Sequence, residues 1–313
     1  MAVAVASRSF ARNPTLRNEL ILRYPLSRFN DTNRVLVGDE LVTFLRGHAS
    51  AITGLDVLTD AVFRAVPELR LVSKYGVGLD MIDLEAARRH GVTVRWTPGV
   101  NCQAVAELTI AFMISLCRSV VPLARELSEG HWRQPGGRQL SSAIVGVLGC
   151  GAVGQTVARL CRAFGAAVLV HDIRTYDRFY LETGVTPVAL ERLLSESDIV
   201  TIHLPLDRST RGLMDARALA LMKPSAFLVN TARGGIVDET ALEAALLEQR
   251  LAGAAADVFS LEQPGDAKLV SLPNFIGTPH IGANTEEAAL AMGRAAMAGL
   301  DGGGGSVDLT SNP

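Results

Sequence analysis

The sequence predicts an α/β protein with parallel sheets, and three observations support this class. Short apolar runs alternate with helical patterns along almost all of the 313 residues. In the second half the apolar runs are uninterrupted, as in strands that are buried on both faces of a parallel sheet. A segment rich in proline and glycine, residues 96–101, separates two such series. At about 150 residues per domain, the length agrees with two domains.

The first series of alternating elements occupies the first hundred residues. The predicted strands are residues 2–6, 50–53, 70–74 and 92–95. The predicted helices are residues 16–23, 57–65 and 84–90. Short connections between them are typical of compact βα units.

A second series follows a long apolar helix pattern at residues 104–116, which we interpret as the crossover into another domain. The predicted strands are residues 144–148, 167–172, 199–205, 227–231 and 254–259. The glycine-rich stretch at residues 302–306 is expected to be a flexible tail.

Composition excludes several classes of function. With 30 Lys and Arg against 32 Asp and Glu, the net charge of −2 provides no basic surface for nucleic acid. The longest apolar stretch, residues 108–117, is too short to span a bilayer, so no membrane is expected. The four cysteines show no CxxC spacing, which predicts neither a metal site nor a disulfide scaffold. Small molecules are therefore the expected ligands, and a reducing cytoplasm the expected compartment.

The clearest motif is the glycine pattern Gly149-Cys150-Gly151-Ala152-Val153-Gly154, between a predicted strand and a predicted helix. The first glycine permits a tight turn, the second lets a pyrophosphate approach the backbone, and the third lets helix and strand pack closely. The phosphates would lie at a helix N-terminus, where free N–H groups favour negative charge. The motif therefore predicts a dinucleotide site.

Asp172 ends the next predicted strand, 18 residues after Gly154 (172 − 154). A carboxylate there can accept hydrogen bonds from the ribose hydroxyls and would repel a 2′-phosphate, which favours NAD over NADP. Arg174 can contact a phosphate, so the preference is not absolute. The alternative interpretation is that Asp172 only caps a strand end.

Three side chains just past strand ends of the second half form a candidate set for redox chemistry on a 2-hydroxy acid. His280, within residues 278–282, can exchange a proton near neutral pH. Arg233, within residues 230–235, can bind a carboxylate bidentately. Glu262, if hydrogen-bonded to His280, would stabilise the charged imidazolium. Taken singly, each residue also has an ordinary structural interpretation, and their shared placement favours the site.

Lys74, Tyr75, Gly76, Val77 and Gly78 follow the last long strand of the first series. Closely spaced glycines expose backbone N–H groups, which can form an anion-binding nest for a carboxylate. The alternative is a plain turn between a strand and a helix.

Taken together, these motifs resemble the D-2-hydroxyacid dehydrogenase family, and the likeness runs over nearly the whole chain. The matching motifs, in family order, are residues 73–80, 97–101, 105–107, 149–154, 230–234, 257–259 and 278–282. Within the family, the chain is similar to members described as phosphoglycerate dehydrogenase-like.

The resemblance implies roles for individual residues. It implies Arg233 as the substrate-orienting arginine, Glu262 as the partner carboxylate and His280 as the acid/base. The implied NAD-site residues are Gly149, Gly151, Ala152, Val153, Gly154, Asp172, Pro205, Thr231, Ala232, Asp257 and Gly282. The implied substrate-binding residues are Lys74, Tyr75, Gly76, Val77, Gly78 and Asn101. One departure is Gln263, which separates Glu262 from the following proline and can displace that loop by a residue.

The resemblance also implies a fold with two Rossmann-like or flavodoxin-like domains. An NAD-binding Rossmann domain, residues 98–282, would be inserted in a discontinuous substrate-binding domain formed by residues 1–97 and 283–313. A helix at residues 284–300 would return to the first domain. The family resemblance further implies a homodimer, formed through the long helix at residues 104–116.

The implied activity is the NAD-dependent interconversion of a D-2-hydroxy acid and its 2-keto acid. Arg8, Arg12 and Lys74 can neutralise a phosphate, which would suit D-3-phosphoglycerate and 3-phosphohydroxypyruvate. The alternatives are a glyoxylate or hydroxypyruvate reductase, or a non-catalytic NAD(H)-sensing binding protein of the same fold.

Overall fold

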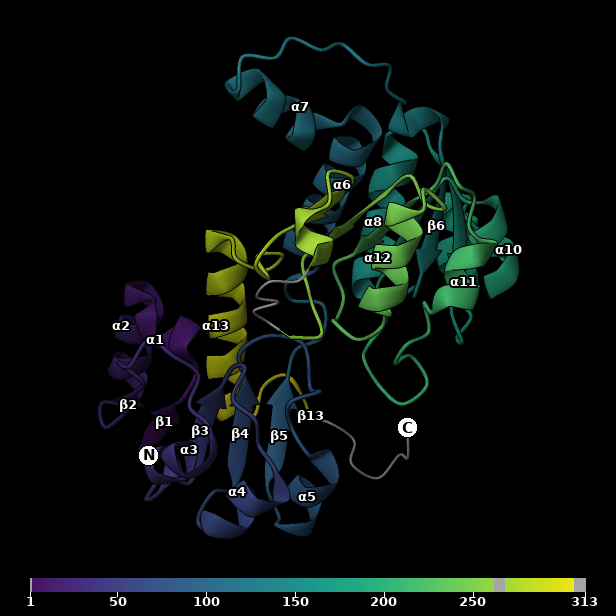
Figure 1. Ribbon diagram of the computed structural model, residues 1–313. Helices are drawn as coiled ribbons and strands as arrows, with labels where there is room; N and C mark the ends of the chain where they lie inside the picture. Colours follow the sequence, from purple (N-terminus) through teal and green to yellow (C-terminus); the bar gives the residue numbers. More distant parts are fainter. Residues whose placement is uncertain (1, 262–267, 307–313) are drawn as a thin grey trace. The chain divides into compact units, whose positions relative to one another are not determined.

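The computed structural model describes residues 2–261 and 268–306, and the chain divides into two compact units (Figure 1). Unit 1 comprises Met1–Asn101 and Asn284–Pro313, and unit 2 comprises Cys102–Ala283. Both units contain a sheet of parallel strands flanked by helices. The predicted α/β class is thereby confirmed.

Unit 1 is built on a six-stranded sheet in the order β13-β5-β4-β3-β1-β2. All neighbouring strands are parallel except β13, which runs antiparallel to β5. The strands are β1 (Val3–Val5), β2 (Arg28–Phe29), β3 (Ser50–Thr53), β4 (Leu71–Lys74), β5 (Thr93–Trp96) and β13 (Gly305–Ser306). The helices are α1 (Arg8–Arg12), α2 (Pro14–Arg23), α3 (Gly38–Leu45), α4 (Asp60–Ala65), α5 (Leu84–Arg89) and α13 (Glu286–Leu300).

Helix α13 is an integral part of the core of unit 1, although it lies far from the rest of the unit in sequence. Its residues Ala296 and Met297 are buried in one cluster with Phe10 and Leu16. A Cβ atom added at Gly293 would lie 2.2 Å from the Leu16 side chain, so the packing of α13 on α2 requires glycine there. The hydroxyl of Ser73 in β4 also donates to the main-chain oxygen of Ala296 at 2.6 Å.

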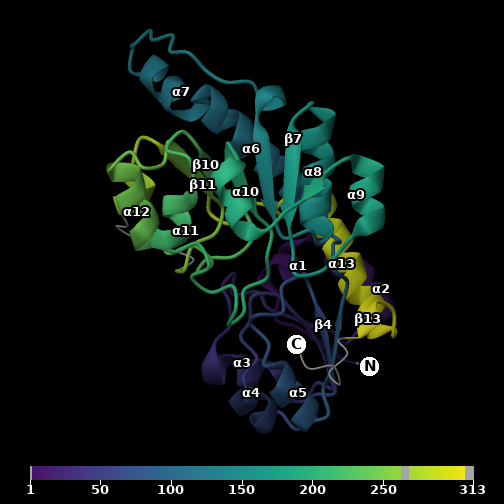
Figure 2. The same cartoon turned by 90° about the vertical axis from the view of Figure 1, so that its right-hand side faces the viewer.

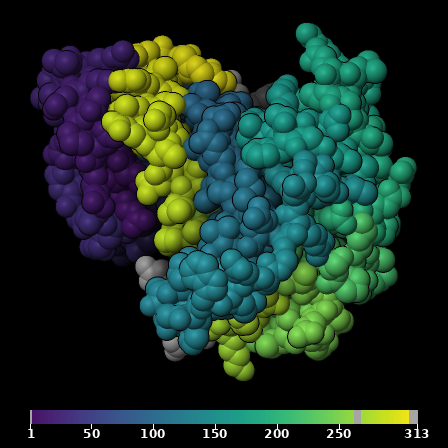
Figure 3. Space-filling model, turned by 90° about the horizontal axis from the view of Figure 1, so that it is seen from above, coloured from purple at the N-terminus to yellow at the C-terminus, as the bar shows by residue number. Residues whose placement is uncertain are grey.

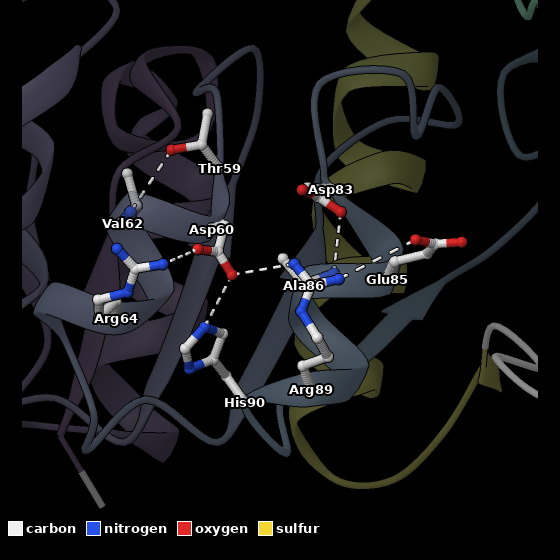
Figure 4. Close-up of polar contacts among 9 residues, drawn as sticks. All are labelled: Thr59, Asp60, Val62, Arg64, Asp83, Glu85, Ala86, Arg89 and His90. Carbon is white, nitrogen blue, oxygen red and sulfur yellow. Dashed lines mark hydrogen bonds and ion pairs between the residues drawn. The ribbon is translucent and has the colours of Figure 1, made fainter.

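A charged cluster ties α4 to α5 (Figure 4). The carboxylate of Asp60 accepts hydrogen bonds from Arg64, from Arg89 at 3.0 Å and from His90 at 3.0 Å. These partners hold the pKa of Asp60 below its usual value, chiefly through the hydrogen bonds from Arg89 and His90. Asp60 also lies in the first turn of its helix, where a negative charge is favoured.

Unit 2 is built on a seven-stranded, fully parallel sheet in the order β12-β11-β10-β9-β6-β7-β8. The strands are β6 (Ile144–Leu148), β7 (Ala167–His171), β8 (Thr186–Pro187), β9 (Ile199–Ile202), β10 (Phe227–Asn230), β11 (Gly253–Ala256) and β12 (Phe275–Gly277). The helices are α6 (Cys102–Arg118), α7 (Val120–Ser128), α8 (Ala152–Ala163), α9 (Asp177–Thr183), α10 (Leu190–Glu196), α11 (Ala216–Leu221) and α12 (Glu239–Leu247), with the 3₁₀ helices η1 (Leu140–Ser142) and η2 (Lys268–Ser271).

The sheet of unit 2 is apolar on both faces. One cluster of buried side chains joins α6 and α8 to the sheet through residues such as Met113 and Val157. The other includes Leu194 of α10, Leu219 of α11 and Leu246 of α12.

The strand order reverses direction at β6, because the chain proceeds to β7 on one side and later to β9 on the other. Figure 2 shows α8 beside β7, with α9 next to α8. Ligands bind at the carboxyl ends of the strands at such a reversal.

Helix α7 has no buried residue, and residues 131–139 after it are exposed as well. The segment lies on the side of the molecule that faces the viewer in Figure 3. Among the described residues no single helix is long and apolar enough to cross a membrane. Helices α6 and α7 meet that length and composition test only as a pair bent by 64°.

Several element predictions need correction. The glycine-rich stretch at residues 302–306 was expected to be a flexible tail, but β13 pairs with β5 there. The predicted strands 199–205 and 254–259 end at Ile202 and Ala256, because the chain turns into loops at the carboxyl edge of the sheet. The predictions also missed several elements, namely helices α1, α3, α7, α9, α10, α11 and α12 and strands β2 and β8.

Candidate functional site

The glycine loop of unit 2 has three glycines that differ in their surroundings. Gly149 has a φ of +96°, and a Cβ there would lie 2.6 Å from the carbonyl oxygen of His203. A Cβ at Gly154 would lie 1.9 Å from the carbonyl oxygen of Gly149, so this glycine lets α8 pack against the loop. A Cβ at Gly151 would meet nothing within 4 Å. The open space is therefore at the second glycine, where a dinucleotide pyrophosphate requires it.

The N-terminus of α8 offers hydrogen-bond donors at the same place. Gly151 is the N-cap residue and provides no side-chain cap. Among the described residues, the main-chain N–H groups of Ala152, Val153 and Gly154 have no hydrogen-bond acceptor. Free N–H groups and the helix dipole favour a bound anion, so these residues fit a dinucleotide phosphate.

Asp172 lies beside this loop, immediately after β7. One carboxylate oxygen accepts from the main-chain N–H of Cys150 at 2.6 Å, and the other from that of Arg174 at 2.8 Å. The thiol of Cys150 is buried, and burial together with the nearby Asp172 raises its pKa to about 12. Cys150 is thus a neutral packing residue at neutral pH.

The loop carrying Arg233 follows β10 and is shaped by Asn230. The Asn230 side chain accepts from the N–H of Ala232 at 3.1 Å and donates to the carbonyl of Arg233 at 2.9 Å. Arg233 itself donates to the carbonyl of Ala232 at 2.8 Å. A Cβ at Gly234 would lie 1.9 Å from the carbonyl oxygen of Phe259, so the loop packs directly against the backbone that follows β11. Asn230 is 4% exposed, and we did not predict its role.

Asp257, which follows β11, anchors the loop that carries His280. Its carboxylate accepts from the Thr278 hydroxyl at 2.5 Å and from the N–H groups of Ile281 at 2.8 Å and Gly282 at 2.7 Å. Its carbonyl accepts from the N–H of His280 at 2.9 Å. His280 has a φ of +56°, a conformation that non-glycine residues rarely adopt, and these bonds surround it.

The structure therefore gathers Arg233, Asp257 and His280 at one edge of the sheet, because β10, β11 and β12 are adjacent and parallel. Glu262 and Gln263 lie outside the described residues. Pro205 is exposed, and its carbonyl accepts from the Thr210 hydroxyl at 2.7 Å.

Another histidine, His203, follows β9 and was not predicted as a site residue. Its Nε2 atom is 2.9 Å from the Thr201 hydroxyl oxygen, whereas its Nδ1 atom has no partner among the described residues. Burial lowers the pKa of His203 to about 3. The ring is therefore neutral near pH 7 and unsuited to proton exchange there. Within residues 2–261 and 268–306, no group of three or more His, Cys, Asp or Glu side chains is placed to hold a metal ion.

The predicted anion-binding loop of unit 1 follows β4. Gly76 has a φ of +107°, and among the described residues the N–H groups of Gly76, Val77 and Gly78 have no hydrogen-bond acceptor. Tyr75 packs its ring edge-on against Phe10, and burial raises the pKa of the Tyr75 hydroxyl to about 12.

Two polar side chains of unit 1 are buried, one at the end of β4 and one at the end of residues 1–101. Lys74 is 4% exposed, and its ammonium group donates to the carbonyl of Gly54. Asn101 is buried, and its side-chain oxygen has no hydrogen-bond partner among the described residues. Of the other cations expected near a phosphate, Arg12 donates to the Asn33 side chain at 2.9 Å and Arg8 is exposed.

Comparison with known proteins points to one family. Residues 110–282 match the family model "D-isomer specific 2-hydroxyacid dehydrogenase, NAD binding domain". The chain is 38% identical over 254 residues to the D-3-phosphoglycerate dehydrogenase of Bacillus subtilis, covering 80% of this chain and 48% of that protein. The chain thus spans about half the length of that relative. It is 36% identical over 236 residues to the hydroxypyruvate reductase of Thermotoga maritima, covering 74% of this chain and 76% of that protein.

Among solved structures, the D-lactate dehydrogenase of Aquifex aeolicus, complexed with NAD and lactic acid, aligns with a TM-score of 0.85. The sequence identity is 25%, and the alignment covers 96% of each chain. The matched domain is an NAD-binding domain, and the glycine loop is open at Gly151. NAD is therefore the cofactor that unit 2 fits. The chain belongs to the D-isomer specific 2-hydroxyacid dehydrogenase family.

Proposed function

We propose that the protein is an NAD-dependent D-2-hydroxyacid dehydrogenase, which interconverts a D-2-hydroxy acid and its 2-keto acid. The observation that carries the proposal is the edge formed by β10, β11 and β12, where Arg233 and the Asp257-anchored loop of His280 follow adjacent strands. NAD, when bound, supplies or accepts the hydride. Unit 2 would be the cofactor domain and unit 1 the substrate-binding domain.

The roles of the side chains follow from their chemistry. Arg233 binds the substrate carboxylate, because a guanidinium can pair with both carboxylate oxygens. His280 returns a proton to the carbonyl oxygen during reduction and removes it during oxidation, with Glu262 supporting its charged form. The free N–H groups of residues 76–78 provide a further anion-binding group on unit 1.

The proposed substrate is a short, unphosphorylated 2-keto acid such as glyoxylate or hydroxypyruvate. Lys74, the cation of the anion-binding loop, is buried and directed to the carbonyl of Gly54. Arg12 donates a hydrogen bond to the neutral side chain of Asn33. The burial of Lys74 favours an unphosphorylated acid over 3-phosphohydroxypyruvate, the alternative that the phosphoglycerate dehydrogenase relatives raise.

The test is a screen of NADH and NADPH oxidation with glyoxylate, hydroxypyruvate, pyruvate and 3-phosphohydroxypyruvate. We expect NADH-dependent turnover of a short keto acid, and loss of that turnover in His280→Ala with NADH binding retained. His48→Ala, a histidine of unit 1 whose ring contacts the carbonyl of Arg46, is the matched control. Turnover retained in His280→Ala would contradict the mechanism. NADH binding without turnover of any acid would instead favour an NAD(H)-sensing binding protein.

We further propose that the protein is a homodimer that acts in the cytoplasm. Helix α7 and the residues after it support a covered interface, because Val120 (48%), Leu127 (56%) and Trp132 (78%) are exposed apolar side chains. By contrast, much of α6 is buried in the core of unit 2. The cysteines are free, which fits a reducing compartment.

Light scattering coupled to size-exclusion chromatography tests the dimer. The wild type should elute as a dimer, and Leu127→Glu should shift it toward the monomer. Leu22→Glu, which changes a more exposed leucine (84%) on α2 of unit 1, should have no effect. A monomeric wild type, or an unchanged dimer in Leu127→Glu, would refute this interface.

A further inference from the structure

Two buried threonine hydroxyls connect α6 with the end of β10. Thr109 lies in α6 and Thr231 immediately follows β10, and their hydroxyl oxygens are 2.8 Å apart. Thr109 is fully buried and Thr231 is 7% exposed. Water therefore does not replace this contact, and the direction of the hydrogen bond matters.

The neighbouring contact of Thr109 fixes that direction. The Thr109 hydroxyl oxygen is 2.8 Å from the carbonyl oxygen of Val105, which can only accept. A threonine hydroxyl has one hydrogen. If Thr109 donated to Thr231, its oxygen would face the Val105 carbonyl oxygen at 2.8 Å with no hydrogen between them. Only the chain Thr231 to Thr109 to Val105 places a hydrogen in both contacts.

This series of hydrogen bonds determines what the Thr231 hydroxyl can offer to a ligand. Its only hydroxyl hydrogen is directed to α6, so its remaining capacity is that of an acceptor. The sheet order indicates which part of a dinucleotide would meet it. If the pyrophosphate lies at the end of β6 and the adenosine ribose at Asp172 after β7, the nicotinamide half would extend toward β9, β10 and β11.

We propose that Thr109 is a positioning residue of the NAD site. Its hydroxyl holds the Thr231 hydroxyl as a hydrogen-bond acceptor for an N–H or O–H group on the nicotinamide half of NAD. The proposal rests on the NAD binding of the proposed function, but it does not depend on turnover or on the identity of the acid.

Two substitutions at Thr109 separate the hydroxyl from the shape of the side chain. Thr109→Val keeps the branched shape and removes the hydroxyl, which frees the Thr231 hydrogen and removes its orientation. Thr109→Ser keeps the hydroxyl. We expect about a fivefold increase in the Kd of NADH for Thr109→Val, the effect of one ordinary hydrogen bond, and a Kd near that of the wild type for Thr109→Ser.

The decisive experiment is a double-mutant cycle with Thr231→Val, using the full chain and titration of NADH fluorescence. If Thr109 acts through the Thr231 hydroxyl, Thr109→Val should change the Kd in the wild-type background and not in the Thr231→Val background. Thr183→Val is the control, because Thr183 makes the same kind of bond to a helical carbonyl, that of Phe179 at 2.6 Å.

Chemical denaturation of each variant measures its stability. If Thr109 had a purely structural role, Thr109→Val would chiefly lower stability rather than NADH affinity. Equal effects of Thr109→Val in both backgrounds, or an unchanged Kd in Thr109→Val, would overturn the proposal. A wild type that fails to bind NADH would overturn both the NAD site and this proposal. A wild type that binds NADH without turning over any acid would contradict only the proposed enzyme activity.

Discussion

Substitution of two glycines in one loop should separate folding from cofactor binding. A Cβ at Gly154 would lie 1.9 Å from the Gly149 carbonyl oxygen, whereas real Cβ contacts are essentially never shorter than 3.0 Å. Gly154→Ala therefore forces backbone to move by about 1.1 Å (3.0 − 1.9) in a buried turn. Overpacking of this kind costs about 1–3 kcal/mol. We expect the free energy of unfolding of Gly154→Ala to fall by about 3 kcal/mol, since backbone rather than a flexible side chain must give way.

Gly151→Ala should behave in the opposite way. The added methyl group meets no atom of the protein within 4 Å, and the backbone at Gly151, with a φ of −71°, suits alanine. Alanine is a poorer N-cap than glycine, but it also restricts the unfolded chain, and the two effects, each below about 1 kcal/mol, oppose one another. The methyl group does occupy the space left for the pyrophosphate. We expect unchanged stability and an increase in the Kd of NADH of about tenfold or more.

The assays are guanidinium denaturation followed by circular dichroism and titration of NADH fluorescence. We expect opposite outcomes, in which Gly154→Ala loses stability and Gly151→Ala loses NADH affinity at full stability. Equal destabilisation by the two substitutions, or NADH binding by Gly151→Ala with the wild-type Kd, would refute it.

Three other predictions concern buried or clustered charges. His203 has a pKa of about 3 when folded and about 6.5 when unfolded, so protons bind the unfolded state preferentially and stability falls as the pH falls below about 6.5. The free energy of unfolding should drop by about 2 kcal/mol between pH 8 and pH 5, and a drop of the same size in His203→Gln would exclude His203 as its source. Asp60→Ala should lower stability at low salt, and the difference from wild type should shrink in 1 M NaCl; a difference independent of salt would argue against an electrostatic origin. Asp257→Asn should lower the free energy of unfolding by about 3 kcal/mol, because an amide nitrogen would face the N–H of Gly282. Faster hydrogen exchange at Gly282 should accompany that loss, and slow exchange there would show that the loop is held by other contacts.

The sequence predicts most strands of the two sheets because strands buried in a parallel sheet consist of apolar runs. Residues 50–53 and 144–148 form strands with the predicted bounds. Helix α3 was missed because its start carries no signal. The N-cap Val37 makes no side-chain bond, and the first residue is Gly38 with a φ of +54°. Strand β13 could not be predicted, since a two-residue strand depends on the β5 edge that it pairs with.

The candidate site divides in the same way between local and long-range signals. The glycine pattern, Asp172 and Arg233 are recognisable as candidates because each lies at or just after an apolar run that predicts a strand. The bonds from Asp257 to the His280 loop span more than 20 residues, and no local pattern indicates them. The contact between Thr109 and Thr231 joins residues 122 positions apart. Both depend on which strands become neighbours, so they emerge only from the folded structure.

Because helix α13 is part of the core of unit 1, this unit can finish folding only late in the synthesis of the chain. Residues 1–101 leave the ribosome roughly 200 residues before the end of α13, which at about 5–20 residues per second is a delay of about 10–40 s. During this interval Phe10 and Leu16 lack the apolar cover that Ala296 and Met297 later provide. Unit 2, whose residues are contiguous, can fold in the meantime. The nascent chain therefore exposes the unfinished core of unit 1 for tens of seconds, which makes this stage the one at which chaperone binding and aggregation compete with folding.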